Sequence, residues 1–283
     1  MRRWSARRCA AVLALVCGGV RPTHAQTSAQ TASPLNIGET FTISSDALHE
    51  TRRINVYLPA AYSATPNAAL PVLYMPDGGI AEDFLHVAGL VQVLSGNGTM
   101  RPFILVGIEN TERRRDLTGP TENPEDRKIA PRVGGSSAFR SFIRMELMPA
   151  IRARYRTTSE TAIVGESLAG LFVVETFLVE PDLFNTYVAF DPSLWWNKGA
   201  LVPYAGQRLP GLTTRSTQLY VATSREPMIA PLTQEFAEVL RAHAPTALTW
   251  HVEFMSEETH ATIFHPAALR AFREVFKPTP ANH

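Results

Sequence analysis

The spacing of apolar positions changes along the chain between the period of a strand and the period of a helix. Short runs rich in β-branched and aromatic residues predict strands, and longer runs with apolar residues three and four positions apart predict helices. Strands are expected at 39–44, 53–58, 70–77, 103–109, 161–165, 186–190, 218–223 and 249–255. Helices are expected at 138–155, directly after residue 167, at 231–242 and at 266–276.

The order of these elements predicts the fold class. The first two strands alternate polar and apolar residues around a polar turn, which favours an antiparallel start to the sheet. The strands at 70–77 and 103–109 are mostly apolar, as expected for strands covered on both faces. The sequence therefore predicts an α/β fold with a mainly parallel central sheet and helices on both faces. Such sheets bind ligands beyond the carboxyl ends of their strands.

One serine lies where a predicted strand meets a predicted helix, in the segment Gly165-Glu166-Ser167-Leu168-Ala169-Gly170. A strained turn with small neighbours, which let the strand and helix backbones pass closely, is typical of a nucleophilic serine. The match to G-x-S-x-G is imperfect because Ala169 stands at the last position. An ordinary turn containing glycine and serine is the alternative interpretation.

A serine hydroxyl needs a base to accept its proton, and the base needs a third group to orient it. His260 is the predicted base, because it lies in a loop between the last predicted strand and the last predicted helix. His251 falls inside that strand and His265 precedes Pro266, so both are better explained as structural.

The acid that would orient His260 is open between several interpretations. Glu226 follows the strand at 218–223, which is the usual place for the third member of a triad, and we select it. Asp191 follows the preceding strand and is the alternative acid. A serine–histidine dyad without an acid is the third possibility.

Acyl transfer also requires backbone N–H groups that face the developing oxyanion. Leu168, which opens the predicted helix, and Gly79, which follows a buried strand, are the expected donors. Trp195 and Trp196 are candidates for a substrate-binding wall, although core packing would explain them equally well. Arg115 is a candidate for binding a polar substrate group, and a solvated charge run is the alternative.

The first 25 residues have the features of a secretory signal. An arginine-rich start precedes an uncharged apolar run at 9–20, and small residues surround Ala25. The run is short for a bilayer span, although a membrane anchor or a basic tail remains the alternative. We expect cleavage after Ala25, a flexible segment at 26–36, a folded domain at 37–276 and a tail at 277–283. The expected location is periplasmic or secreted, without stable membrane insertion.

Removal of this signal changes what the composition implies. It carries five arginines and no acidic residue, so the formal net charge falls from +1 to −4, which argues against a nucleic-acid partner. The only two cysteines, Cys9 and Cys17, leave with it, so the mature chain has no disulfide, cysteine metal site or cysteine nucleophile. We expect no metal and no organic cofactor.

Several segments together carry a family resemblance, and they occur in order between about residues 37 and 276. They are 53–59, 73–79, 106–110, Arg115-Asp116-Leu117-Thr118, 165–170, Pro192-Ser193-Leu194-Trp195-Trp196 and the loop of His260. The chain resembles the esterase-D-like branch of the α/β-hydrolases, the "Putative esterase" family. The Arg-Asp-Leu-Thr and Pro-Ser-Leu-Trp-Trp segments are most similar to the subgroup that contains periplasmic siderophore esterases.

The resemblance implies an α/β-hydrolase domain at 37–276 with Ser167 and His260 at the catalytic positions. In the family, the residue after Asp-Gly lends its N–H to the oxyanion hole, which here is Gly79. Ala169 replaces a usual glycine. Relatives often carry Gly-x-x-Glu where this chain has Thr223-Ser224-Arg225-Glu226, so the acid stays open.

The expected function is an exported serine carboxylic-ester hydrolase that acts on a small-molecule ester through an acyl-serine intermediate. An acyltransferase would use the same residues with an alcohol in place of water, so the sequence does not separate the two. A non-catalytic binding protein that kept the fold is the third hypothesis.

Overall fold

The computed structural model describes residues 32–212 and 217–278. The chain divides into two units, Met1–Asn36 and Ile37–His283. The predicted signal peptide lies outside the described residues. Residues 32–36 form neither helix nor strand, and the described helices and strands all belong to the second unit.

The described residues form a sheet of eight strands in the order β1-β2-β4-β3-β5-β6-β7-β8. The strands are β1 (Glu39–Ser45), β2 (Glu50–Tyr57), β3 (Leu70–Pro76), β4 (Ile104–Ile108), β5 (Thr157–Glu166), β6 (Thr186–Phe190), β7 (Gln218–Thr223) and β8 (Thr249–Phe254). β2 runs antiparallel to both of its neighbours, and every other pair is parallel. The predicted α/β-hydrolase fold is confirmed.

Helices lie between the strands of this sheet and after the last one. They are α1 (Ala60–Ala64), α2 (Phe84–Gly96), α3 (Arg113–Asp116), α4 (Ser136–Phe142), α5 (Met148–Arg154), α6 (Leu168–Val179), α7 (Trp196–Gly199), α8 (Leu201–Arg208), α9 (Ala230–His243) and α10 (Phe264–Val275). The expected helix at 138–155 is divided into α4 and α5 by a π-helical segment, Ile143–Leu147. Helix α2 was not predicted, although its buried side chains have helical spacing.

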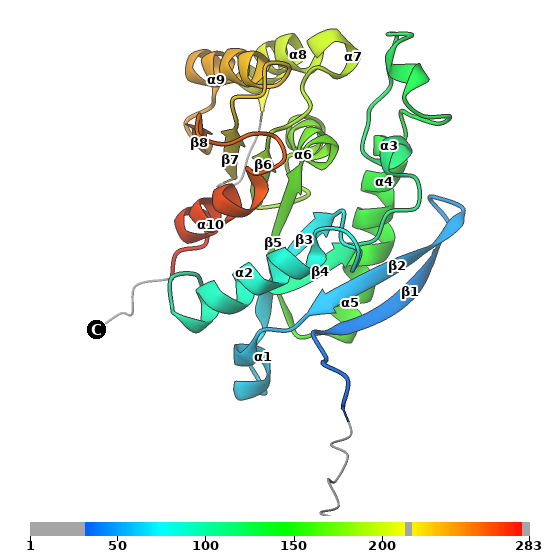
Figure 1. Cartoon of the computed structure of the whole chain (residues 1–283), viewed down its shortest axis with the longest axis vertical. Helices are drawn as coiled ribbons and strands as arrows, with labels where there is room; N and C mark the ends of the chain where they lie inside the picture. The colour runs from blue at the N-terminus through cyan, green and yellow to red at the C-terminus, as the bar shows by residue number, and fades with distance from the viewer. Residues whose placement is uncertain (1–31, 213–216, 279–283) are drawn as a thin grey trace, which may run out of the picture. The chain divides into compact units, whose positions relative to one another are not determined.

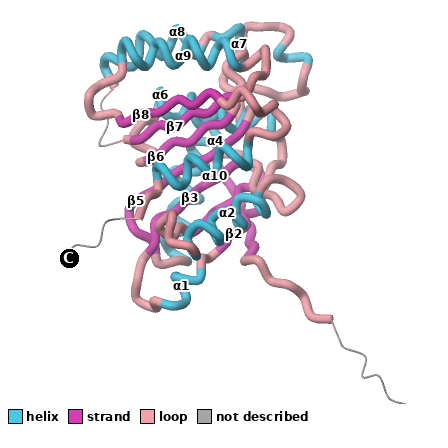
Figure 2. Tube along the Cα trace, turned by 60° about the vertical axis from the view of Figure 1, so that its left-hand side comes forward, coloured by secondary structure: helices cyan, strands magenta, loops and turns pink. Residues whose placement is uncertain are grey.

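Alternate side chains of each central strand point to opposite faces of the sheet, and each face has its own core. In β3, Val72 and Tyr74 belong to the larger core, which α4, α5, α6, α8 and α9 cover. Leu73 and Met75 belong to the smaller core under α2 and α10. Figures 1 and 2 show α2 and α10 in front of the strands with α6 behind them. This two-sided cover explains why the central strands are apolar throughout.

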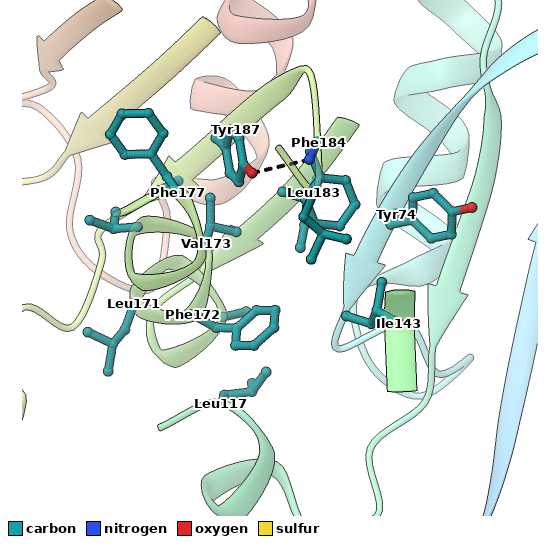
Figure 3. Close-up of a cluster of buried hydrophobic side chains, with 14 of the residues drawn as sticks. Tyr74, Leu117, Ile143, Leu171, Phe172, Val173, Phe177, Leu183, Phe184 and Tyr187 are labelled. Atoms are coloured by element: carbon teal, nitrogen blue, oxygen red, sulfur yellow. Dashed lines mark hydrogen bonds between the residues drawn. The ribbon is translucent and has the colours of Figure 1, made fainter. Parts of the chain in front are cut away.

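Helix α6 is buried on nearly all sides, because it lies between the sheet and the outer helices (Figure 3). The rings of Phe177 and Tyr187 pack edge to face with their centroids 5.5 Å apart. The Tyr187 hydroxyl accepts a hydrogen bond from the Phe184 amide and donates one to the Glu180 carbonyl. This packing anchors the C-terminal end of α6 against β6.

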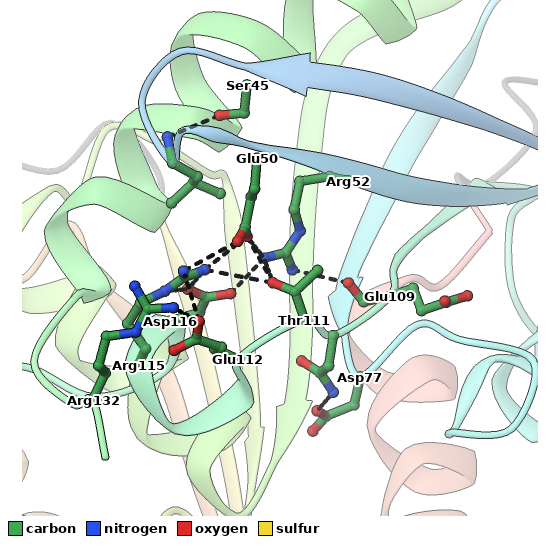
Figure 4. A network of polar contacts seen from close by, with 12 residues as sticks. Ser45, Glu50, Arg52, Asp77, Glu109, Thr111, Glu112, Arg115, Asp116 and Arg132 are labelled. Atoms are coloured by element: carbon green, nitrogen blue, oxygen red, sulfur yellow. Dashed lines mark hydrogen bonds and ion pairs between the residues drawn. The ribbon is translucent and has the colours of Figure 1, made fainter. Parts of the chain in front are cut away.

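A buried ionic network holds the segment after β4 against the β1–β2 hairpin (Figure 4). The Arg52 guanidinium donates to Asp116 at 2.5 Å, and both side chains are fully buried. Arg52 also donates to the carbonyl of Glu109. Asp116 accepts a second hydrogen bond from Arg115, which in turn pairs with Glu50. The network ties the last two residues of α3 to the β1–β2 hairpin.

Replacing Asp116 with alanine is expected to lower the free energy of unfolding by about 3 kcal/mol, the lower end of the cost of breaking a buried ion pair, because Arg52 loses its buried partner and keeps Glu50. Urea denaturation of the mature protein measures the change. The control is Glu125→Ala, which removes an exposed ion pair with Lys128 and should cost less than about 1 kcal/mol. Equal effects of the two substitutions would contradict a structural role for the buried pair.

Candidate active site

Ser167 occupies a strained turn between β5 and α6. Its backbone has φ 60° and ψ −118°, which few residues other than glycine adopt. The Ser167 amide donates to the Phe190 carbonyl at 3.0 Å, which anchors the turn to β6. A Cβ atom on Gly165 would lie 2.6 Å from the backbone of Ala169, so the chain requires glycine there. The turn lifts the serine side chain beyond the end of the strand.

His260 connects this serine to a buried carboxylate. Its Nε2 lies 3.1 Å from Ser167 Oγ, and its Nδ1 lies 3.0 Å from Asp191 Oδ2. The three residues follow β5, β8 and β6, so all of them stand at the carboxyl end of the sheet. A proton held on Nδ1 by the carboxylate leaves Nε2 free to accept the serine proton.

Hydrogen-bond donors around the Asp191 carboxylate keep it ionised. Its side chain is fully buried, and it accepts hydrogen bonds from the Thr223 hydroxyl and from both the amide and the hydroxyl of Ser224. Burial raises the pKa of this carboxyl, but the hydrogen bonds from His260 and Ser224 outweigh that effect and the net pKa is lowered. The carboxylate therefore keeps its charge beside the imidazole at neutral pH.

The structure corrects the predicted acid, because Asp191 rather than Glu226 lies against His260. Glu226 precedes α9, and its carbonyl accepts from the amides of Ile229 and Ala230. Its charge contributes to the electrostatic field at His260 from a distance. Both acids follow strand ends, as expected, but the β6 loop brings its carboxylate closer to the imidazole than the β7 loop does.

The surroundings of His260 favour its protonated form. The hydrogen bond with Asp191 raises the pKa of the imidazole, partial burial opposes this, and the charge of Glu166 adds to the rise. An imidazole with this environment accepts a proton readily and stabilises the cation that forms during proton transfer.

Two residues near the serine were not predicted. Glu166 Oε1 lies 3.2 Å from Nδ1 of His260, so this nitrogen faces a second carboxylate. Ser193 Oγ lies 3.4 Å from Ser167 Oγ, and the Ser193 amide donates to the Ser167 carbonyl. The sequence held one signal for Glu166, namely its position directly before the serine.

The two expected oxyanion donors differ in their present partners. Leu168 is the first residue of α6, where the first amides of a helix have no acceptor within the helix. The Gly79 amide instead donates to the Glu82 carboxylate at 2.6 Å. The Glu82 carboxylate also accepts from the Asn110 amide at 3.3 Å. Gly79 can serve an oxyanion only after Glu82 turns away, which is a departure from the expected open donor.

The structure also changes which arginine borders the site. Arg115 is bound to Glu50 and Asp116 in the ionic network, so its assignment to substrate binding is corrected. Arg113 instead forms a bidentate ion pair with Asp77. The positive charge of Arg113 also opposes the rise that burial causes in the pKa of Glu166, which is next to the serine.

The two tryptophans have different surroundings. Trp196 is buried, and its Nε1 donates to the carbonyl of Gly119, so it is part of the core framework. It also borders a cavity of about 310 Å³ beside α6, which Leu171 and Glu175 line as well. Trp195 is half-buried and packs against the larger core. Of the pair, Trp196 reaches the cavity, and Trp195 keeps a partly exposed surface.

The described part of the chain contains neither a candidate metal cluster nor a candidate membrane span. No cluster of three or more histidine, cysteine, aspartate or glutamate side chains there has the arrangement of a metal site. None of its helices is long and apolar enough to cross a membrane.

Comparison with known proteins places these features in a family. The ferri-bacillibactin esterase BesA of Bacillus subtilis is 31% identical over 194 residues, 62% of this chain and 66% of that protein. The siderophore triacetylfusarinine C esterase of Aspergillus fumigatus is 31% identical over 180 residues, 59% of each chain. The match thus spans about two thirds or less of these curated relatives.

Solved structures of esterases and serine hydrolases have the same fold as this chain. An IroE-like serine hydrolase from Shewanella oneidensis superposes with a TM-score of 0.76 at 31% identity, over 84% of this chain and 80% of that one. The siderophore hydrolase EstB from Aspergillus nidulans shares the fold, with a TM-score of 0.72 at 21% identity, over 89% and 99% of the two chains. The sequence matches the "Putative esterase" family over residues 45–255, and the chain belongs to that family.

Proposed function

We propose that the chain is a serine esterase that hydrolyses carboxylic esters through an acyl-Ser167 intermediate. The observation that carries this proposal is the continuous contact from Ser167 Oγ through His260 to Asp191. Membership of an esterase family and the siderophore esterases among its relatives support the same activity.

The reaction uses His260 twice. Ser167 Oγ attacks the carbonyl carbon of the ester as its proton passes to Nε2, and Asp191 stabilises the resulting imidazolium through Nδ1. The tetrahedral intermediate then expels the alcohol, which takes the proton from Nε2. Water repeats the sequence on the acyl-serine, which releases the carboxylic acid and restores the serine.

The oxyanion of each tetrahedral intermediate needs preorganised donors. The Leu168 amide, at the N-terminus of α6, is one of them in this proposal. The Gly79 amide is the second, once substrate entry displaces the Glu82 carboxylate that it now holds.

The substrate is proposed to be an ester of the siderophore class. This rests on the relatives, whose names describe esterases of ferri-bacillibactin and of triacetylfusarinine C. Trp195 offers a partly exposed aromatic surface for such a ligand. Export to the periplasm or the medium, after cleavage at Ala25, is proposed from the sequence of the first 25 residues.

A fluorophosphonate probe tests the proposed mechanism, and it is expected to label the mature protein on Ser167, as located by mass spectrometry. A panel of siderophore esters, feruloyl esters and short-chain aryl esters then tests the substrate class. Siderophore esters are expected to give the highest kcat/KM. Failure of both labelling and hydrolysis of every ester would refute the proposed function, and a preference for another ester would refute the substrate class alone.

A further inference from the structure

Nδ1 of His260 faces two carboxylates instead of one. Asp191 Oδ2 lies 3.0 Å from it and Glu166 Oε1 lies 3.2 Å from it. A ring nitrogen carries at most one hydrogen, so the two acids share one donor. Glu166 is held in place by its position, because it is the last residue of β5 and directly precedes the strained Ser167.

The two carboxylates differ in their surroundings. Asp191 accepts three hydrogen bonds from Thr223 and Ser224 in addition to the one from His260, so it is stable as an anion. Burial raises the pKa of Glu166 to about 7, although the positive charges of His260 and Arg113 oppose the rise. Glu166 therefore changes its charge in the same pH range as an ordinary histidine, and Asp191 does not.

Resting on the proposed function, we infer that Glu166 is a positioning residue, a second partner for Nδ1 of His260 whose charge sets the pH at which the imidazole serves as the base. It acts through His260 and has no direct part in bond making. When Glu166 is ionised, the imidazolium is surrounded by two anions and holds its proton to higher pH. When Glu166 is protonated, or is replaced by a neutral residue, Asp191 is the remaining anion beside Nδ1. The imidazole then loses its proton, and can act as the base, at lower pH.

Charged groups from several loops face this pair. The charges that act on Glu166 are those of His260 after β8, Asp191 after β6, Arg113 of α3 and Asp77 after β3. Glu226 after β7 adds to the field at His260. Arg113 and Asp77 neutralise each other through their ion pair, and Asp191 stays charged. Among these groups, Glu166 is the one that both contacts the imidazole and titrates near neutrality.

The variant Glu166→Gln tests the inference, because glutamine keeps the size of the side chain and removes its charge at every pH. The acidic limb of the kcat/KM profile for a short-chain ester is expected to move to lower pH by about one unit. Glu226→Gln is the matched control. It removes a carboxylate that acts on His260 without contact, so its shift should be clearly smaller. An unchanged limb in Glu166→Gln, or equal shifts in both variants, overturns the inference.

A second measurement does not depend on turnover. The ¹⁵N chemical shifts of the His260 ring, assigned by comparison with His260→Asn, report its protonation in the resting protein. The titration of this ring is expected to move to lower pH in Glu166→Gln, and an unmoved titration overturns the inference even if the variant turns over slowly. If Ser167 fails to label and no ester is hydrolysed while the ring titration moves as expected, the proposed esterase function fails and the coupling of Glu166 to His260 stands.

Discussion

Replacing Ser167 with alanine is expected to lower kcat for ester hydrolysis by about six orders of magnitude. The hydroxyl oxygen lies 3.1 Å from the imidazole that would activate it, and alanine offers no atom to attack the carbonyl. Initial rates with a chromogenic aryl ester measure the loss. The fluorophosphonate label should disappear in the same sample, because both reactions need the same oxygen.

Ser193→Ala is the control for that experiment. Its hydroxyl lies 3.4 Å from that of Ser167 and is buried, so it is the neighbouring serine that a misassignment would choose. We expect this variant to keep the label on Ser167. Loss of the label in Ser193→Ala with its retention in Ser167→Ala would reverse the assignment of the nucleophile.

Asp191→Asn is expected to lower kcat by about four orders of magnitude, which is the second largest effect. The asparagine oxygen can still accept from the Ser224 amide and Thr223, which turns its NH₂ group toward His260. This NH₂ group favours Nδ1 as an acceptor, with the ring proton on Nε2, where it blocks proton transfer from Ser167. Glu166 is then the neighbouring carboxylate left to hold a proton on Nδ1. Pre-steady-state acylation rates measure this loss directly.

The same measurement on Glu226→Gln separates the two acids. Because Glu226 acts on His260 from a distance, its replacement should change kcat by less than about tenfold. A larger loss in Glu226→Gln than in Asp191→Asn would restore Glu226 as the orienting acid. Near-normal rates in both variants would favour the serine–histidine dyad.

Most of the strands and helices could be predicted from the sequence. Apolar runs such as the one at 70–77 are long enough to be strands and too apolar to face water, so they predicted a sheet covered on both faces. Helix α2 was missed although its buried residues have helical spacing. The expected helix at 138–155 was interrupted by a π-helical segment, which depends on local backbone hydrogen bonds rather than on the apolar pattern.

The residues of the site were harder to predict where the same residue type occurs at several neighbouring positions. Three consecutive arginines at 113–115 are equivalent by composition, yet Arg115 turns into the ionic network and Arg113 pairs with Asp77 at the site. Helical geometry explains the separation, because successive residues of α3 point about 100° apart. The sequence alone does not show which of the three arginine side chains points toward Ser167.

By itself, the sequence determined the α/β fold, the turn that carries Ser167 and the choice of His260 as its partner. These features follow from local patterns of apolar spacing, small residues and strand ends. The tertiary structure decided which acid meets the imidazole, and it revealed Glu166 as a second neighbour. Those contacts depend on how loops that are distant in the chain converge within a few ångströms, and no local pattern of residues encodes that distance.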